Sequence, residues 1–303
     1  MIRLVLVTGF LGSGKTTFLK GLLSKDSGER LSLIINEFGR IGVDGALLSP
    51  LTLSLREVAG GSIFCACRLE EFENALQQAA AENPDLILVE ASGLSDPAPI
   101  RSVLARHPQI AYQGCVALCD ATRVEKVMAS ARVSLRQLSV SNLILLNKTD
   151  LVPECETARL TAMLLARFPL AKVLATTQGR CPNEWLESLS PAGEYVPHQE
   201  GRDVTLQKAS ISLSSAMDRV ECLAFIRLFA EETYRIKGFV RLYEGWFLAD
   251  CVGAYIQLQP CGEPPAGQES GLTALAGQGM ELRKALREAA QWYKEYLLEI
   301  RFG

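Results

Sequence analysis

The sequence predicts an α/β fold: a mostly parallel sheet with helices on both faces, followed by a smaller α+β domain. Three observations support this prediction. Apolar runs of strand length alternate with helical patterns through the first 188 residues, as in chains whose parallel strands are covered by helices. A turn-rich stretch follows, and beyond it short alternating strands replace the continuous apolar runs. We therefore expect one domain over residues 1–188, a linker over 189–203 and a second domain over 204–303.

The strands expected in the first domain are nearly continuous apolar runs, because a parallel strand covered on both faces has no polar side. They are Leu4–Thr8, Leu31–Asn36, Leu86–Glu90, Cys115–Asp120, Leu143–Asn147 and Val173–Ala175. Apolar residues at helical spacing predict the helices between them, near 16–24, 69–81, 97–106, 154–167 and 182–188. Ligands of such sheets bind at the carboxyl ends of the strands, so motifs at those ends are the candidates for function.

The second domain has the pattern of a small sheet covered by helices. From Leu282 to Ile300, apolar residues recur at helical spacing, which predicts one terminal amphipathic helix. Residues 261–271 are rich in Gly and Pro and predict a loop. The remaining elements are strands over 204–213, 235–242, 245–250 and 253–259 and a helix over about 217–230.

Composition excludes several classes of protein. The 48% hydrophobic and 21% charged residues are ordinary for a soluble globular chain, and the net charge of −3 gives no basic footprint for nucleic acid or a membrane surface. No apolar run approaches the roughly 18 residues that a membrane span needs. The nine cysteines, an odd number in a long chain without a secretory signal, predict no disulfide framework and a cytoplasmic location.

The first motif follows the first expected strand. Residues 9–16 read Gly-Phe-Leu-Gly-Ser-Gly-Lys-Thr, which matches the phosphate-binding loop of P-loop NTPases, with a helix expected directly after it. Its glycines let backbone N–H groups point at phosphate oxygens, Lys15 reaches the β- and γ-phosphates, and the Thr16 hydroxyl can bind Mg²⁺. The expected phosphate-binding residues are Gly9, Gly12, Ser13, Gly14, Lys15, Thr16 and Thr17.

The second motif, Asn147-Lys148-Thr149-Asp150, ends another apolar strand. Such a pattern suits a guanine base: the Asp150 carboxylate can accept from guanine N1–H and N2–H, a donor pair that adenine lacks. Asn147 can meet the base edge and Lys148 can lie across the ring. A base that left these polar groups unpaired would be rejected. The alternative is a simple turn or helix cap, which binds no base.

Two further strand ends carry acidic residues. Glu90 is followed by Ala-Ser-Gly, so it can hold Mg²⁺ or orient the attacking water, while the Gly93 N–H approaches a γ-phosphate. The glycine-containing segment 36–44, which follows the second expected strand, offers Glu37 and Asp44 as ligands for Mg²⁺ or a second metal. This segment could order around the γ-phosphate and relax on hydrolysis; the alternative is an ordinary solvated loop.

Together these residues resemble the CobW-like family of GTPases, relatives of the GTPases that deliver metals to nickel and cobalamin enzymes. The resemblance implies GTP hydrolysis coupled to metal handling or to maturation of a client metalloprotein. It is weaker in the second half of the chain. Its carriers are Gly9–Thr17, Asn36–Gly39 with Asp44, Gly60–Arg68, Glu90–Pro97 and Asn147–Asp150.

The sequence departs from this family at its cysteine motif. Members usually carry Cys-x-Cys-Cys, whereas only Cys65 matches here and Cys67 is an extra thiol two residues on. Two thiolates, with Glu37 as a third ligand, could bind Zn²⁺ or another transition metal, but a closed zinc site needs four ligands. The alternative is two reduced loop cysteines that bind nothing.

The sequence therefore predicts a regulatory GTPase that converts GTP to GDP with slow intrinsic turnover, using Lys15, Glu90 and Asp44 for catalysis and GTP with Mg²⁺ as ligands. A second hypothesis is a metal- or client-binding chaperone in which nucleotide is only a switch. A third is an ATP-dependent kinase on the same loop. The client protein, the metal and any self-association remain open.

Overall fold

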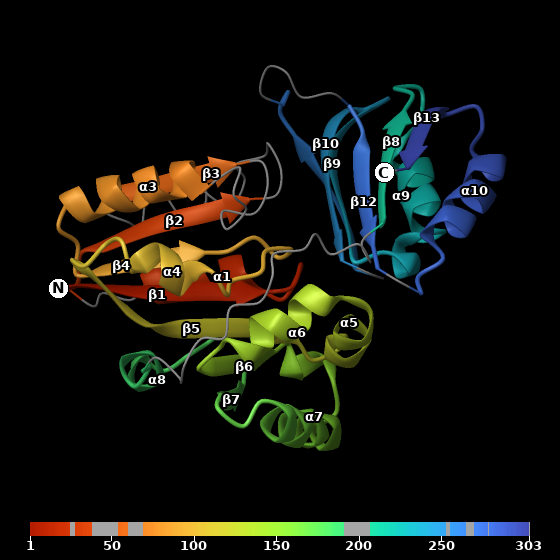
Figure 1. Cartoon of the computed structure of the whole chain (residues 1–303). Coiled ribbons are helices and arrows are strands. Elements are labelled where there is room, and N and C mark those ends of the chain that lie inside the picture. The colour runs from red at the N-terminus through yellow and green to blue at the C-terminus, as the bar shows by residue number, and fades with distance from the viewer. Residues whose placement is uncertain are drawn as a thin grey trace. The chain divides into compact units, whose positions relative to one another are not determined.

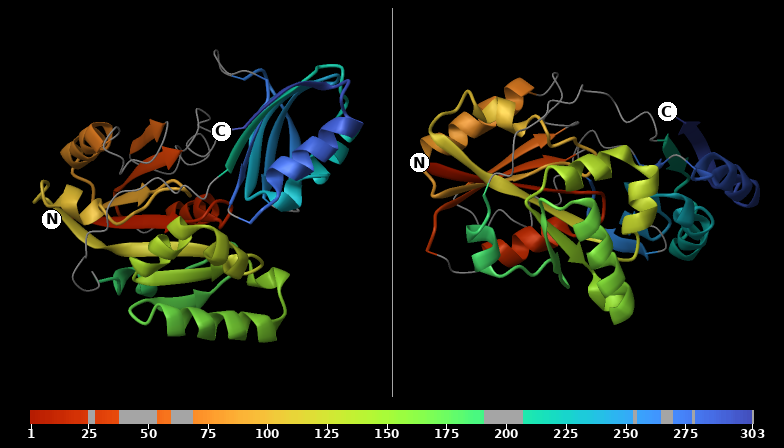
Figure 2. Two further views of the ribbon diagram at one scale, coloured as in Figure 1. Left: turned by 45° about the vertical axis from the view of Figure 1, so that its right-hand side comes forward. Right: turned by 60° about the horizontal axis from the view of Figure 1, so that its bottom comes forward.

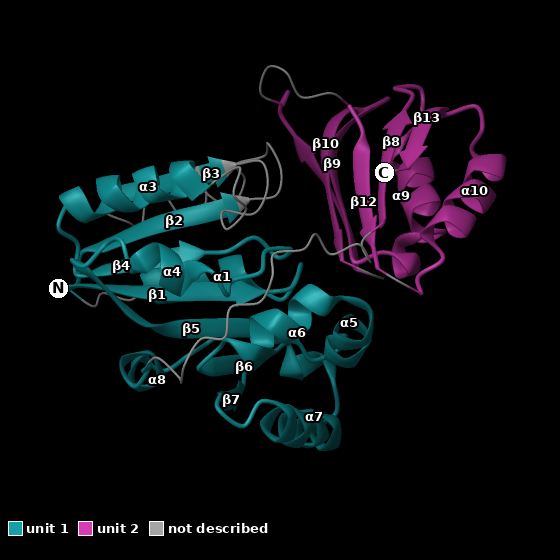
Figure 3. Ribbon diagram, viewed as in Figure 1, with its two compact units in different colours: residues 1–201 teal, residues 202–303 magenta. Residues whose placement is uncertain are grey.

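A parallel sheet of seven strands organises the first of two units in the computed structural model (Figures 1 and 3). The structure describes residues 1–24, 28–37, 54–59, 69–190, 207–252, 255–264, 270–277 and 279–302. The chain splits into residues 1–201 and 202–303, and each unit is described by itself. The predicted fold class is confirmed. Of the linker predicted over 189–203, residues 191–203 lie outside the described ranges.

The strand order of the first unit is β3-β2-β4-β1-β5-β6-β7, with every neighbouring pair parallel. The strands are β1 (Ile2–Gly9), β2 (Leu31–Glu37), β3 (Ser54–Ala59), β4 (Leu86–Glu90), β5 (Ile110–Asp120), β6 (Leu143–Asn147) and β7 (Lys172–Ala175). The register pairs Val7 with Glu90 and Asp120 with Asn147. The ends of β1, β4, β5 and β6 therefore meet at one edge of the sheet.

Helices cover both faces of this sheet (Figures 1 and 2). They are α1 (Lys15–Leu23), α3 (Leu69–Ala81), α4 (Ile100–Leu104), α5 (Val124–Ser130), α6 (Arg132–Ser139), α7 (Glu154–Arg167) and α8 (Asn183–Glu187), with a 3₁₀ turn η2 (Thr149–Leu151) after β6. The sequence did not predict β3, α5 or α6. The strand β3 lies at the edge of the sheet and is charged rather than continuously apolar, and the two helices, of 7 and 8 residues, are too short for a clear helical period.

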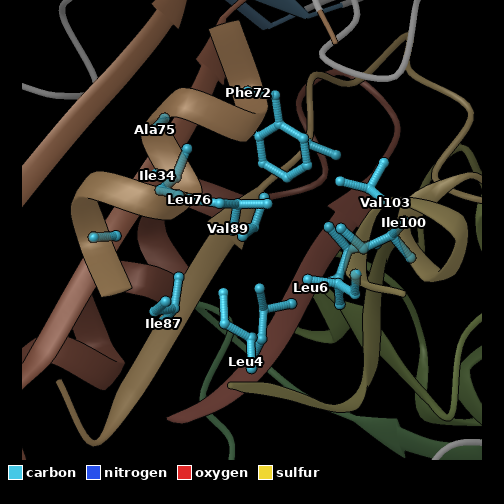
Figure 4. Packing of buried hydrophobic residues seen from close by; sticks show 14 of the residues in the cluster. Leu4, Leu6, Ile34, Phe72, Ala75, Leu76, Ile87, Val89, Ile100 and Val103 are labelled. Carbon is cyan, nitrogen blue, oxygen red and sulfur yellow. The ribbon is translucent and has the colours of Figure 1, made fainter. Parts of the chain in front are cut away.

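Alternate residues of β1 supply the two halves of the core, because successive side chains of a strand point to opposite faces. Leu4 and Leu6 pack with Phe72 of α3 and Val103 of α4 (Figure 4). Val5 and Val7 pack on the other face, with Phe18 and Leu19 of α1. Burial on both faces explains why the predicted strands were continuous apolar runs.

The second unit is an antiparallel sheet of six strands in the order β11-β10-β9-β12-β8-β13, with α9 and α10 on one face (Figures 1 and 2). Phe225 of α9 packs edge-on against Tyr293, with ring centroids 5.4 Å apart. The elements are β8 (Gln207–Leu213), α9 (Arg219–Arg227), η3 (Ala230–Glu232), β9 (Arg235–Leu242), β10 (Gly245–Val252), β11 (Tyr255–Cys261), β12 (Leu272–Ala276), α10 (Leu282–Trp292) and β13 (Leu297–Phe302).

One prediction for this unit is wrong: the terminal helix does not run to residue 300. It ends at Trp292, and the last residues form β13, in which Ile300 pairs with Ile211 and Phe302 with Ala209 of β8. Apolar residues at 297 and 300 fit helical spacing, but Ile300 and Phe302 also alternate with Glu299 and Arg301 as a strand requires. Pairing with β8 decides between the two periods. None of the described helices is long and apolar enough to cross a membrane.

Candidate functional site

The loop between β1 and α1 folds back over a buried lysine. The Lys15 side chain lies in the first turn of α1 with the residue only 8% exposed, and its Nζ donates to the carbonyl oxygens of Gly9 at 2.9 Å and Phe10 at 3.4 Å. A buried ammonium needs such acceptors, since burial without them is costly. The contacts hold the charge of Lys15 inside the loop, where the sequence predicted phosphates.

Two glycines let this loop pack tightly. Gly9 has φ 138° and Gly14 has φ 102°, both in the region that favours glycine. A Cβ at Gly9 would lie 2.3 Å from the carbonyl oxygen of Leu118, and one at Gly14 would lie 2.3 Å from Asn147 Nδ2. The loop is therefore pressed against the ends of β5 and β6, and no side chain fits at either position.

Hydroxyl groups complete the loop. The side-chain oxygens of Thr8 and Ser13 are buried and have no hydrogen-bond partner within the described part of the chain. Hydroxyl groups can donate to phosphate oxygens, so an anion would satisfy groups that the protein leaves unused. At the start of α1, Thr16 is half-buried and Thr17 is exposed. Gly12 lies in the turn between β1 and α1 and has φ 74°.

Asn147 joins three parts of the edge. Its Nδ2 donates to the Ser13 carbonyl oxygen at 2.9 Å, and its Oδ1 accepts from the Gly179 N–H at 2.8 Å. The loop after β7 is tied in as well, because the Thr149 hydroxyl donates to the Thr176 carbonyl oxygen at 3.0 Å. The structure thus brings the two strongest sequence motifs together, residues 9–16 and 147–150, because Asn147 is hydrogen-bonded to the phosphate loop.

Lys148 and Asp150 lie beside this junction. Lys148 Nζ donates to Asp120 Oδ2 at 2.5 Å, and Asp150 is exposed in the turn η2. Sequence reasoning missed Asp120 and Gly179 as members of the site. Asp120 ends a predicted strand and could have been noticed by that position, whereas Gly179 follows β7 with no motif to mark it.

Helix α6 holds the segment that follows β4. Gln137 Nε2 donates to the carbonyl oxygens of Gly93 and Ser95, both at 3.1 Å. Gly93 also lies against the phosphate loop, since a Cβ there would be 2.8 Å from the Leu11 nitrogen. From β2, Asn36 Oδ1 accepts from the Ser95 hydroxyl at 3.2 Å. This segment is therefore fixed between α6, β2 and the phosphate loop.

A mostly apolar pocket lies beside the phosphate loop, between the end of β5 and helices α5 and α6. Ser13 of the phosphate loop and Asp120 at the end of β5 line it on one side, and Val127 and Leu138 line it from the helices. The predicted guanine-binding residues 147–150 do not line it. Asp120 connects the two, since it lines the pocket and pairs with Lys148.

Residues 3–174 match the family described as CobW/HypB/UreG, nucleotide-binding domain, over more than half of the chain. The chain belongs to this family. The resemblance predicted from the motifs is confirmed, and the matched residues include the phosphate loop, Glu90 and Asn147–Asp150.

Three curated relatives are similar to this chain over part of their length. The zinc chaperone YjiA of Escherichia coli (strain K12) is 32% identical over 219 residues, which cover 66% of this chain and 69% of that protein. The zinc chaperone YeiR of the same strain is 35% identical over 164 residues, covering 52% of this chain and 50% of that protein. The zinc-regulated GTPase metalloprotein activator 1 of Schizosaccharomyces pombe (strain 972 / ATCC 24843) is 25% identical over 244 residues, covering 73% of this chain and 57% of that protein.

Several metal ligands predicted for this family member fall outside the described residues. These are Asp44, Cys65 and Cys67, together with the side chain of Glu37. Within the described ranges, no group of three or more His, Cys, Asp or Glu residues is placed to hold a metal ion. Cys119 lies at the end of β5, and burial, reinforced by the charge of Asp120, raises the pKa of its thiol well above the usual range. Its Sγ donates to the carbonyl oxygen of Leu145 at 3.7 Å.

Proposed function

We propose that this chain is a GTPase that binds GTP with Mg²⁺, hydrolyses it slowly to GDP, and couples this cycle to metal delivery or metalloprotein maturation. The observation that carries the proposal is the double hydrogen bond of Asn147, to Ser13 of the phosphate loop and from Gly179 after β7. These bonds join Asn147, a residue of the proposed guanine motif, to the loop proposed to bind the phosphates. A nucleotide can then contact both motifs at once.

The base would lie beside η2. The exposed carboxylate of Asp150 is available to accept from guanine N1–H and N2–H, and the stem of Lys148 to lie across the ring. An adenine base would leave the Asp150 carboxylate facing no donor pair, which is costly in a desolvated site. This arrangement favours guanine and disfavours the ATP-dependent kinase.

The phosphates would lie over the start of α1. The ammonium of Lys15 offsets the charge that develops on the transferred phosphoryl group, and the N–H groups at the start of α1 point toward it. We expect the Gly93 N–H to approach the γ-phosphate; the hydrogen bond from Gln137 and the close approach of Gly93 to Leu11 support this role. Little else is required of the protein, because catalysis of phosphoryl transfer is mainly positioning and charge stabilisation.

The oxygen donors at this edge fit Mg²⁺, which prefers hydroxyl and carboxylate oxygens. Thr16 is half-buried after β1, and Glu90 is 5% exposed at the end of the adjacent β4. When bound, the ion neutralises charge on the β- and γ-phosphate oxygens. Glu90 can hold the ion or orient the attacking water, and Asp44 remains a proposed third ligand.

The metal-handling part of the proposal draws on the relatives, which are named zinc chaperones and a metalloprotein activator. The chain spans 50–69% of these relatives' lengths, so their partners are transferred here as proposals only. We propose Zn²⁺ or another transition metal as cargo, with Cys65, Cys67 and Glu37 as its ligands, and a metalloprotein as client.

Nucleotide binding tests the first part. Purified protein is titrated with fluorescent GTP and Mg²⁺, and unlabelled GTP and ATP compete for the site. We expect GTP to compete and ATP not to, Lys15→Ala to abolish binding, and Asp150→Asn to relax the preference for guanine. Lys20→Ala, a change of the same residue type in α1 outside the loop, is the matched control and should bind normally. Equal competition by ATP would favour the kinase.

Metal analysis tests the second part. The protein is loaded with Zn²⁺ in the presence of GDP or a non-hydrolysable GTP analogue, and the bound metal is measured after desalting. We expect a stoichiometry that depends on the nucleotide and is lost in Cys65→Ser/Cys67→Ser. The exposed Cys155 gives the control Cys155→Ser, which should bind metal as the wild type does. Unchanged metal in the double variant would refute these ligands.

A further inference from the structure

Asp120 and Lys148 form an ion pair at the ends of two neighbouring strands. Lys148 Nζ lies 2.5 Å from Asp120 Oδ2, with 29% of the lysine side chain and 11% of the aspartate side chain exposed. The pair spans β5 and β6, whose register places Asp120 opposite Asn147. It is therefore largely shielded from water and from the salt screening that weakens surface pairs.

Asp120 is itself fixed in place. Its second carboxylate oxygen, Oδ1, accepts from the Thr122 N–H at 2.9 Å and from the Thr122 hydroxyl at 2.7 Å. One oxygen of the carboxylate is thus held by Thr122 and the other is aimed at Lys148. A carboxylate held on both sides can impose a position on its partner.

Lys148 is fixed at both ends. Its backbone has φ 63°, a left-handed conformation that is uncommon for a residue with a side chain. The carbonyl oxygen of the preceding Asn147 accepts from the Ala121 N–H at 2.9 Å, which holds the end of β6 to the segment after β5. With the backbone held here and the ammonium held by Asp120, the methylene stem between them has little freedom.

We propose that Asp120 is a positioning residue that pins the Lys148 ammonium, so that the lysine stem forms a fixed apolar shelf for the purine ring. The inference rests on the proposed GTP binding and deepens it. A lysine without this partner would have to lose rotamer freedom when the base binds, which weakens affinity. The shelf contacts the face of the ring, where purines are alike. Asp120 therefore sets affinity for purine nucleotides in general, and Asp150 sets the choice of guanine.

The two roles are separable by measuring dissociation constants for GTP and for inosine triphosphate, which lacks the 2-amino group. Asp120→Asn keeps an oxygen that can accept from Thr122 and removes the charge that faces Lys148. We expect both nucleotides to bind about tenfold more weakly, a change of about 1.4 kcal/mol in each binding free energy, with their ratio unchanged. Asp150→Asn should instead change the ratio.

Controls distinguish positioning from a structural role. Asp250→Asn removes a comparable ion pair in the second unit, where Asp250 Oδ2 lies 3.0 Å from Arg235 Nη2, and should leave both constants unchanged. In a Lys148→Ala background, Asp120→Asn should have no further effect, because the side chain that it positions is gone. Thr122→Val removes one of the two Thr122 donors and should weaken both nucleotides in the same direction, by about threefold.

The outcomes separate this inference from the proposed function. Wild-type protein that fails to bind GTP refutes the proposed function. Wild-type protein that binds GTP, together with an Asp120→Asn variant of equal affinity or altered GTP-to-inosine ratio, refutes the positioning role alone. Should Asp120→Asn not fold, unchanged constants in Thr122→Val would refute it equally.

Discussion

Two helices of nine residues each, α1 in the first unit and α9 in the second, begin in opposite ways. Helix α9 has a complete capping box: Asp218 accepts from the Glu221 N–H at 2.8 Å, and Glu221 accepts from the Asp218 N–H at 3.2 Å. Helix α1 begins after Gly14, which has no side-chain cap, and no acidic residue lies in its first turn. The first N–H groups of a helix need acceptors outside the helix. At α9 the Asp218 side chain supplies one such acceptor, whereas at α1 Gly14 has no side chain that could do so.

The two sheets also differ in where their polar side chains lie. In the first unit, β4 and β6 are buried at every residue, so polar side chains collect where the strands end. In the second unit, buried residues of β8 and β10 alternate with half-buried ones after the first two residues of each strand, and neighbouring antiparallel strands end at opposite edges. A parallel sheet therefore concentrates chemistry at one edge, and an antiparallel sheet does not.

The largest effect is expected from a side chain added at Gly14, directly before α1. In Gly14→Ala, the new Cβ would lie 2.3 Å from Asn147 Nδ2, at a φ of 102° that alanine rarely adopts. Steric overlap and backbone strain should together weaken GTP binding on the order of 100-fold. Titration with fluorescent GTP measures the loss.

Gly21→Ala is the matched control for this change. Gly21 lies in the interior of α1, and a Cβ there would meet nothing within 4 Å. Alanine should bind GTP normally and stabilise the helix by about 0.5–1 kcal/mol, because glycine loses more backbone entropy on folding. Equal losses of affinity in both variants would mean that the start of α1 has no special role.

The sequence predicted the main motifs of the site but missed one site residue and the end of one helix. The phosphate loop and Asn147–Asp150 were found because each requires particular residues next to a buried strand. Asp120 was missed as a site residue, since a single aspartate at a strand end has no motif, and its role depends on Lys148, 28 positions away. The end of α10 was missed because Ile300 fits a helical period with Leu297 and a strand period with Phe302, and only pairing with β8 selects the strand.

The next largest effects are expected at Asn147, and comparison with Asn142 at the other end of β6 separates stability from GTP binding. Asn147→Ala leaves the Ser13 carbonyl and the Gly179 N–H without the side chain that joins them. We expect a loss of roughly 2–4 kcal/mol in the free energy of unfolding, because two buried polar groups lose their partner. GTP should also bind about tenfold more weakly, since the loop loses its support. Denaturant unfolding and GTP titration measure the two effects.

Asn142 provides the control at the other end of the strand. It is also buried, accepts from the Cys115 N–H and donates to the Ser190 carbonyl oxygen, both at 2.8 Å. Asn142→Ala should cost a similar free energy of unfolding and leave GTP affinity unchanged. If both variants lost GTP affinity equally, the effect of Asn147 would come from general destabilisation.

The smallest effect is expected at α9, the helix that begins with a complete capping box. Asp218→Ala removes the acceptor for the Glu221 N–H and should lower the free energy of unfolding by about 1 kcal/mol, while GTP affinity stays at the wild-type value. Asp218→Asn retains a side-chain oxygen in the same place and should lose much less, because asparagine caps helices about as well as aspartate. Denaturant unfolding of the two variants separates the hydrogen bond from the negative charge: equal losses would assign the effect to charge. A fall in GTP affinity in Asp218→Ala would show that the capped helix is not independent of the nucleotide, and would remove the distinction between the two helix starts.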